Sequence, residues 1–167
     1  MFFSVSGLLQ EPVGSKRKHE LGPQAPLLHA SVELVRLTHA ALVRLSGEVA
    51  IDTICSRCLA PFSYVAPLQF EEIFVQQVDV ATGAKVDSEE GDEESFAIGL
   101  DHTIDITEAV RQYTEMAAAM QPLCQPECPG LCAKCGQDLT LGACACDRTP
   151  LDSRWAALAE LRLRSNG

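Results

Sequence analysis

Four closely spaced pairs of cysteines are the residues of this chain with the clearest chemistry. In chain order the pairs are Cys55-Ser-Arg-Cys58, Cys124-Gln-Pro-Glu-Cys128, Cys132-Ala-Lys-Cys135 and Cys144-Ala-Cys146. Two thiolates on one tight turn can hold one edge of a tetrahedral zinc ion, and a second pair completes the tetrahedron. The eight thiols therefore suffice for two zinc ions, each held by four cysteines. A site closed by four cysteines has no open position for water or substrate, which indicates a structural metal.

Disulfides and a redox role are the alternatives for these thiols. Disulfides require an oxidising compartment. The apolar start, Met1 to Leu9, has no basic residue ahead of it, and Lys16-Arg17-Lys18 follows it, which is the reverse of a secretory signal. No later stretch approaches the roughly 18 apolar residues of a membrane span. These features favour a reducing cytoplasm without membrane attachment, where paired cysteines bind metal.

The spacing also predicts which pairs share a metal. The third and fourth pairs are close in sequence, and Gly136 allows the positive φ of a zinc-knuckle turn, so these pairs are expected to form a local site. The first and second pairs would then form a long-range site. An alternative joins the second and third pairs and leaves the first free.

Charge is unevenly distributed along the chain. The net charge is −10 over 167 residues. Residues 76–110 carry one lysine against ten acids, a net −9, centred on residues 87–94. Aromatic residues make up only 5%, so the composition argues against tight nucleic-acid binding. The acidic run is either a solvated loop or a contact for a basic partner.

Residues 1–121 are predicted to form a β-rich domain. Alternation is clearest between Leu27 and Val75, with a turn at Thr38-His39 and a bulge at Gly47. The first cysteine pair should reverse the chain between two antiparallel strands. With 47% apolar residues the chain can bury a sizeable core.

Four further segments complete the predicted organisation. Residues 79–103 form an acidic loop and residues 107–120 a helix with apolar positions three and four apart. Residues 122–150 form a lobe too poor in apolar side chains to fold by burial, so metal would supply the folding energy. Residues 151–167 form a helix that packs back on the domain, and the extreme termini are expected to fray.

The predicted fold class is α+β: an antiparallel β-sheet, partly open and barrel-like, with two or three helices and a small Cys-rich zinc lobe.

No catalytic constellation accompanies the cysteines. The four histidines are scattered and none neighbours a cysteine pair. Phosphate-binding glycine loops, HExxH and GxSxG are all absent from the sequence. The chain is therefore predicted to be neither an enzyme nor a binder of a small-molecule substrate.

Several segments, taken together, resemble a known family. They are Val5–Ser15, Cys55–Phe62, Ile104–Val110, the long cysteine motif Pro122–Leu139, Cys144–Asp147 and Asp152–Leu158. In order and spacing they are similar to the YceD family, the large ribosomal RNA subunit accumulation proteins. The resemblance implies a bacterial or plastid factor that supports synthesis, processing or stability of large-subunit (23S) ribosomal RNA.

Three hypotheses for function follow. In the first, the chain acts through ribosomal proteins or assembly factors, which its acidic segment would contact. In the second, it binds a 23S rRNA precursor directly. Folding would then gather five basic residues into one patch: Lys16, Arg17, Lys18, Arg57 and Lys134. In the third, it is a generic zinc-stabilised protein-interaction module.

Overall fold

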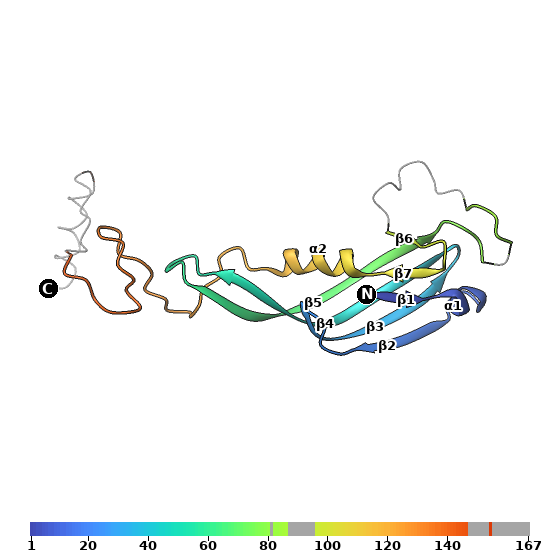
Figure 1. Cartoon of the computed structure of the whole chain (residues 1–167), viewed down its shortest axis with the longest axis horizontal. Helices are drawn as coiled ribbons and strands as arrows, with labels where there is room; N and C mark the ends of the chain where they lie inside the picture. The colour runs from blue at the N-terminus through green and yellow to red at the C-terminus, as the bar shows by residue number, and fades with distance from the viewer. Residues whose placement is uncertain (81, 87–95, 147–153, 155–167) are drawn as a thin grey trace. The chain divides into compact units, whose positions relative to one another are not determined.

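The computed structural model describes residues 1–80, 82–86, 96–146 and 154 (Figure 1). The chain forms two compact units. The first contains Met1–Thr53 and Pro61–Pro122, and the second contains Ile54–Ala60 and the chain from Leu123 onward. The metal lobe predicted for residues 122–150 is thus joined by the turn that carries the first cysteine pair. The acidic residues 87–94 and the predicted C-terminal helix, apart from Arg154, lie outside the described residues.

A five-stranded sheet forms the body of the first unit (Figure 1). Its strands, in spatial order, are β2 (Lys16–Leu21), β3 (Leu27–Leu37), β4 (Ala40–Ile54), β5 (Pro61–Gln76) and β6 (Phe96–Ile98). The β3–β4 pair is antiparallel as predicted, and β2, a strand that the sequence does not predict, also pairs antiparallel with β3, whereas β5 and β6 run parallel. The described strands form an open sheet with β2 and β6 at its edges. The barrel-like curvature stays a prediction.

The N-terminus is ordered, so the prediction that it frays is wrong. Strand β1 (Phe2–Ser4) pairs antiparallel with β7 (Thr103–Asp105), and helix α1 (Ser6–Gln10) follows. The physical reason is burial of apolar side chains. Those buried from this segment are Phe3, Val5, Leu8 and Leu9.

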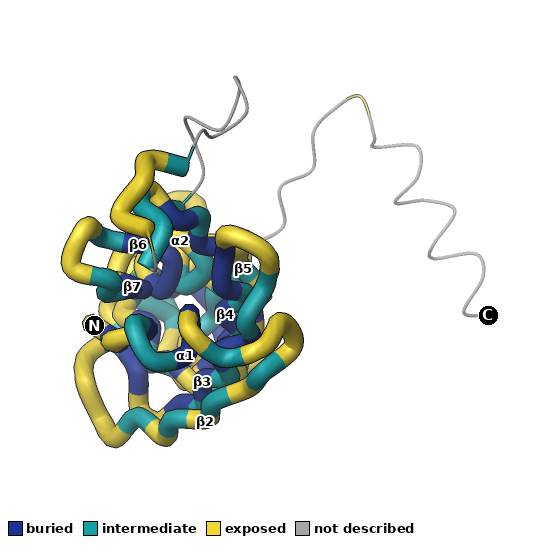
Figure 2. Tube along the Cα trace, turned by 90° about the vertical axis from the view of Figure 1, so that its right-hand side faces the viewer, coloured by how far each residue is buried: buried dark blue, intermediate teal, exposed yellow. Residues whose placement is uncertain are grey.

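Alternation along the strands places one face of the sheet in the core (Figure 2). The strand side chains that share this face include Ala30, Val32, Leu34, Ala41, Val43, Leu45, Ala66, Leu68 and Phe70. Helix α2 (Thr107–Ala117) packs against β5, and its buried residues Ala109 and Val110 belong to the core. The ring of Tyr113, on the same helix, stacks on Phe70 with centroids 4.6 Å apart.

Helix α2 ends earlier than the predicted residue 120. Ala118 has extended backbone, and the N–H of Ala119 donates to the Tyr64 hydroxyl at 2.8 Å instead of continuing the helix. Met120 is fully exposed rather than part of the apolar face. A tertiary hydrogen bond to β5 thus ends the helix before the apolar spacing does.

Gly47 lies beside an irregularity of the sheet, although the irregularity belongs to the facing strand. The register of β3 against β4 shifts between Leu27 and His29, and Gly47 pairs with Ala30. A Cβ atom at Gly47 would lie 2.3 Å from the His29 carbonyl oxygen. The bulge predicted at Gly47 is therefore on β3, and glycine is required where the two backbones approach.

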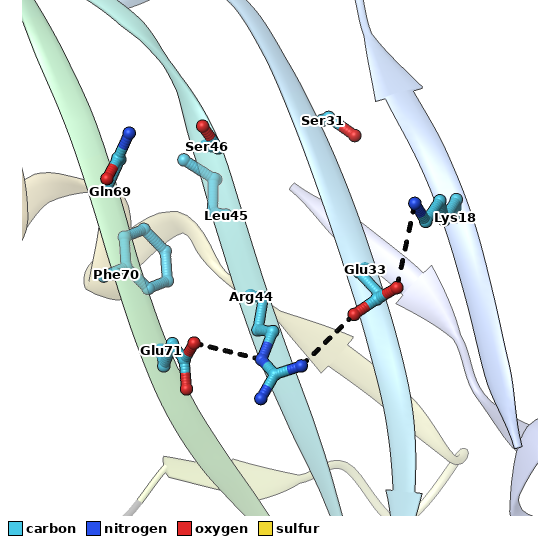
Figure 3. Close-up of a pocket in the computed structure, with 9 residues that line it drawn as sticks. All are labelled: Lys18, Ser31, Glu33, Arg44, Leu45, Ser46, Gln69, Phe70 and Glu71. Atoms are coloured by element: carbon cyan, nitrogen blue, oxygen red, sulfur yellow. Dashed lines mark hydrogen bonds and ion pairs between the residues drawn. The ribbon is translucent and has the colours of Figure 1, made fainter. Parts of the chain in front are cut away.

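The other face of the sheet carries a row of cross-strand ion pairs (Figure 3). Lys18 on β2 lies 3.9 Å from Glu33 on β3, and Arg44 on β4 lies 3.4 Å from Glu33 and 3.0 Å from Glu71 on β5. These charges border a hollow of about 470 Å³. Burial alone would raise the pKa of Glu33, but Lys16, Arg44 and Lys18 outweigh it and hold the pKa below its usual range.

Replacing Arg44 with alanine tests what this row contributes. The change leaves Glu33 and Glu71 without the cation between them, so we expect the free energy of unfolding to fall by about 1 kcal/mol. Urea unfolding followed by circular dichroism measures it, and the loss should shrink in high salt.

The matched control for this prediction is Arg111→Ala. Arg111 pairs with Glu108 and Glu115 along the exposed face of α2. Helix pairs of this kind contribute about 0.3–0.5 kcal/mol. Equal losses from the two variants, both indifferent to salt, would contradict a specific role for the row.

Candidate metal centres

The eight cysteines gather into two groups of four. We name metal centre 1 the group of Cys55, Cys58, Cys124 and Cys128. Metal centre 2 is the group of Cys132, Cys135, Cys144 and Cys146. Within each group the sulfur atoms all lie within 4.8 Å of one another. This is the pairing that the spacing favours, and the alternative that joins the second and third cysteine pairs is wrong.

Metal centre 1 draws its sulfurs from distant parts of the sequence. The turn between β4 and β5 is closed by the Cys55 N–H, which donates to the Ala60 carbonyl at 2.9 Å, and by the Leu59 N–H, which donates to the Cys55 carbonyl at 3.0 Å. Cys55 and Cys58 are buried by this turn. The segment that follows α2 supplies the other two thiols, of which Cys128 is fully buried.

The sulfur spacing of metal centre 1 fits a tetrahedral zinc ion. The Sγ atoms of Cys55 and Cys128 are 3.7 Å apart, as are those of Cys58 and Cys124. A zinc–sulfur bond of about 2.3 Å gives a tetrahedron with edges of about 3.8 Å. A disulfide would require about 2 Å. All eight cysteines are free thiols, and the spacing of the four sulfurs in this centre is compatible with metal binding.

Metal centre 2 is built on a local hairpin. The Cys132 N–H donates to the Gln137 carbonyl, and the Gly136 N–H donates to the Cys132 carbonyl, both at 2.8 Å. A β-bridge between Leu131 and Asp138 closes the turn. Gly136 has φ +73, which confirms the positive φ predicted for the residue after the second cysteine of a knuckle.

The acid–base properties of the thiols show why a cation suits both centres. Backbone N–H groups of Cys124 and Cys58 lower the pKa of the Cys55 thiol to about 6. A hydrogen bond with Cys135 raises the pKa of the Cys146 thiol to about 12. Cys55 in metal centre 1 therefore ionises readily, while Cys146 in metal centre 2 shares its proton with a neighbouring sulfur and holds it. A divalent cation would supply the charge that lets all four ionise.

The segment that carries six of these cysteines has almost no apolar core. Among residues 123–146 the buried positions are Cys128, Gly130 and Cys132. The side chain of Leu141 is 86% exposed. As the composition indicates, burial of apolar side chains contributes little to holding this segment together, and the two groups of cysteines could supply the missing folding energy if they bind metal.

Comparison with known proteins identifies the family. A family model described as large ribosomal RNA subunit accumulation protein YceD matches residues 43–162, well over half of the chain. The chain belongs to the YceD family. The matched region contains all eight cysteines, and hence both candidate metal centres of this YceD chain.

Relatives of this YceD chain occur in bacteria and plants. An uncharacterized protein of Mycobacterium tuberculosis is 30% identical over 140 residues, which cover 83% of this chain and 63% of the relative. In Zea mays, the chloroplastic large ribosomal RNA subunit accumulation protein YCED homolog 1 is 27% identical over 148 residues, covering 74% of this chain and 50% of the relative. The chain thus spans less than two thirds of the length of these relatives. No solved structure matches it.

The five basic residues suggested as RNA contacts fall into both units. Lys16, Arg17 and Lys18 lie on β2 in the first unit, a strand that the sequence does not reveal. Lys16 and Lys18 both pair with Glu33, and Arg17 pairs with Glu11.

The other two basic residues, Arg57 and Lys134, lie in the second unit, inside the turns of the first and third cysteine pairs. Both residues are exposed. The Arg57 guanidinium nevertheless donates to the Cys128 carbonyl at 2.9 Å. Within the described part of the chain, four of the five basic side chains therefore have an intramolecular partner.

Proposed function

We propose that this YceD-family chain is a non-enzymatic ribosome-biogenesis factor that supports synthesis, processing or stability of 23S ribosomal RNA. The observation that carries the proposal is the match of residues 43–162 to a family described by large ribosomal RNA subunit accumulation. The maize relative is likewise named for large ribosomal RNA subunit accumulation, in the chloroplast. The protein would act where its ribosomes are assembled, in the cytoplasm.

Two structural zinc ions belong to this proposal. Metal centres 1 and 2 each offer four sulfurs, and the 3.7 Å spacings of centre 1 match a tetrahedral zinc site. Zinc bound by four thiolates supplies folding energy and no open coordination position. The metal would therefore shape the second unit rather than activate a substrate.

Features of the first unit support a non-enzymatic role. The hollow on the sheet places its carboxylates, Glu33 and Glu71, beside Arg44 (Figure 3). The cations that surround Glu33 favour its ionised form, so it is not poised as a general acid.

In the ranges that the structure covers, no helix is long and apolar enough to span a membrane.

Contact with a basic protein partner is the mode of action that the charges favour. Residues 76–110 carry a net −9, which would attract a basic ribosomal protein or assembly factor and speed its association. Direct binding to 23S rRNA would have to break the pairs that Lys16 and Lys18 form with Glu33, and Arg17 with Glu11. These intramolecular pairs weigh against RNA as the first contact.

Neutralising the acidic segment tests this mode of action. A variant in which the six acids of residues 87–94 become Asn or Gln keeps the length of the segment and removes its charge. We expect it to lose co-purifying basic ribosomal proteins or assembly factors at low salt. In cells depleted of the natural protein, it should also fail to restore 23S rRNA.

A variant with the same eight residues in scrambled order is the matched control, since it keeps the charge. It should recover the same partners as the natural chain. Unchanged partners and unchanged 23S rRNA in the neutral variant would overturn the proposed contact. Salt-dependent binding of a 23S precursor fragment that Arg17→Ala abolishes would support the direct-RNA alternative instead.

A further inference from the structure

Arg57 makes contacts with the second half of metal centre 1 through both its side chain and its backbone. Its guanidinium Nη1 donates to the carbonyl oxygen of Cys128 at 2.9 Å. Its own carbonyl accepts the N–H of Leu131 at 3.1 Å. Arg57 lies between two ligands, Cys55 and Cys58, while Cys128 is the buried ligand on the other side. Arg57 thus makes two hydrogen bonds from the turn of the first cysteine pair to the segment that contains Cys128.

Gly130 shows how closely the two segments are packed. Its φ is +73, and a Cβ atom there would lie 3.0 Å from the Arg57 carbonyl oxygen and 3.1 Å from the Arg57 Cβ. A side chain at this position would therefore be strained by its backbone and crowded by Arg57. Gly130 permits the approach that lets Arg57 reach Cys128.

The segment held by Arg57 also connects the two metal centres. Only residues 129–131 separate Cys128 of metal centre 1 from Cys132 of metal centre 2. Within them, the Gly130 carbonyl accepts the N–H of Leu139, which belongs to the hairpin of metal centre 2. The segment held by Arg57 is therefore continuous with the start of metal centre 2.

Lys134 provides an internal comparison. Cys55-Ser-Arg-Cys58 and Cys132-Ala-Lys-Cys135 have the same spacing, so Arg57 and Lys134 occupy equivalent positions in their turns. Both residues are exposed and both are cationic. Arg57 differs in its contact with a ligand residue of the same centre. A planar guanidinium holds a carbonyl in fixed geometry better than a flexible ammonium does.

We propose that Arg57 is a positioning residue of metal centre 1, which orients Cys128 for coordination and holds the Cys128–Cys132 connection in place. The inference rests on the zinc binding proposed above and is independent of the proposed ribosomal role. It assigns Arg57 a function different from the RNA contact that the sequence suggests. Partners that orient metal ligands typically change metal affinity by about 10- to 100-fold when they are removed.

The test compares zinc release from four variants of the full chain. Arg57→Ala removes the contact, Arg57→Lys keeps the charge, and Gly130→Ala disturbs the same contact from the opposite side. Lys134→Ala is the matched control in the equivalent turn. Native mass spectrometry counts the bound zinc, and transfer of zinc to a chromophoric chelator gives the release rate of each ion.

We expect one of the two ions to leave about 10- to 100-fold faster from Arg57→Ala and Gly130→Ala, with the other ion much less affected. Arg57→Lys should restore part of the difference, and Lys134→Ala should match the natural chain. With cobalt in place of zinc, Arg57→Ala should change the ligand-field spectrum of one centre, which reports coordination geometry rather than general stability.

If the natural chain binds two zinc ions and Arg57→Ala and Lys134→Ala release them at equal rates, the positioning role of Arg57 is overturned, while the metal centres are not. The same holds for an unchanged cobalt spectrum. A natural chain that binds no zinc would overturn the metal centres themselves. None of these readouts uses ribosomal RNA, so failure of the proposed ribosomal function is detected separately.

Discussion

Replacing Cys58 with serine is expected to reduce the bound zinc from two ions to one and to unfold the part of the second unit that metal centre 1 holds. Cys58 is buried, and its sulfur lies 3.7 Å from that of Cys124. Among the described residues of this unit, 54–60 and 123–146 bury few side chains other than those of cysteines. Structural zinc contributes roughly 10–16 kcal/mol to folding in small metal-binding peptides, so the local loss should be large.

Hydrogen–deuterium exchange measures this loss by segment. In Cys58→Ser, the amides of residues 54–60 and 123–131 should exchange rapidly, whereas those of β3 should stay protected. Cys144→Ser is the matched variant in metal centre 2. It should also bind one zinc ion, but protection of residues 54–60 should survive and exchange should rise from residue 132 onward. Identical exchange patterns in the two variants would contradict two separable centres.

Truncating Phe74 to alanine should have the largest effect on the first unit. Its ring on β5 is 1% exposed and stacks on Phe96 of β6, with centroids 5.1 Å apart. Removing a buried aromatic ring typically costs about 3–5 kcal/mol, through lost burial and the cavity that remains. Chemical unfolding followed by circular dichroism should show this loss, while bound zinc stays at two ions because both centres belong to the second unit.

Phe2→Ala is the control for this truncation, since it removes the same ring from a side chain that is 75% exposed. Its effect should stay within about 0.5 kcal/mol. Equal losses from Phe2→Ala and Phe74→Ala would show that the core around β5 and β6 is not the source of stability. Loss of zinc from Phe74→Ala would show that the two units do not fold separately.

The sequence predicts the features that rest on local chemistry. Cysteine spacing gives metal centre 2 directly, because a knuckle and a short loop bring its sulfurs together locally, and the two remaining pairs are then left for metal centre 1. The reversal of the chain at Cys55–Cys58 and the turn at Thr38-His39 are confirmed for the same reason. His39, with φ +54, lies between β3 and β4.

Features that are set by tertiary contacts cannot be predicted from the sequence. Strand β2 consists mostly of polar residues at an edge of the sheet, so it has no apolar alternation, and only its pairing with β3 defines it. The parallel β6 depends on a partner far along the chain, as does the pairing of β1 with β7. The end of α2 is decided by the Tyr64 hydroxyl on β5. Each of these depends on a contact that has no local pattern.

The contact of Arg57 with Cys128 belongs to the same class. A basic residue between two cysteines suggests a rigid and exposed charge, so the sequence suggests that Arg57 contacts RNA. Its carbonyl partner is 71 residues away along the chain. The glycine at position 130 was the available signal, since a glycine two residues after a ligand cysteine permits a close approach of backbone.

The native mass of the protein, purified from cells without added metal or chelator, tests directly whether the cysteines hold two zinc ions. We expect one folded species that carries two zinc ions, with all eight cysteines reduced. A folded species without metal would contradict this expectation, and so would a mass lowered by two hydrogens for each cystine formed.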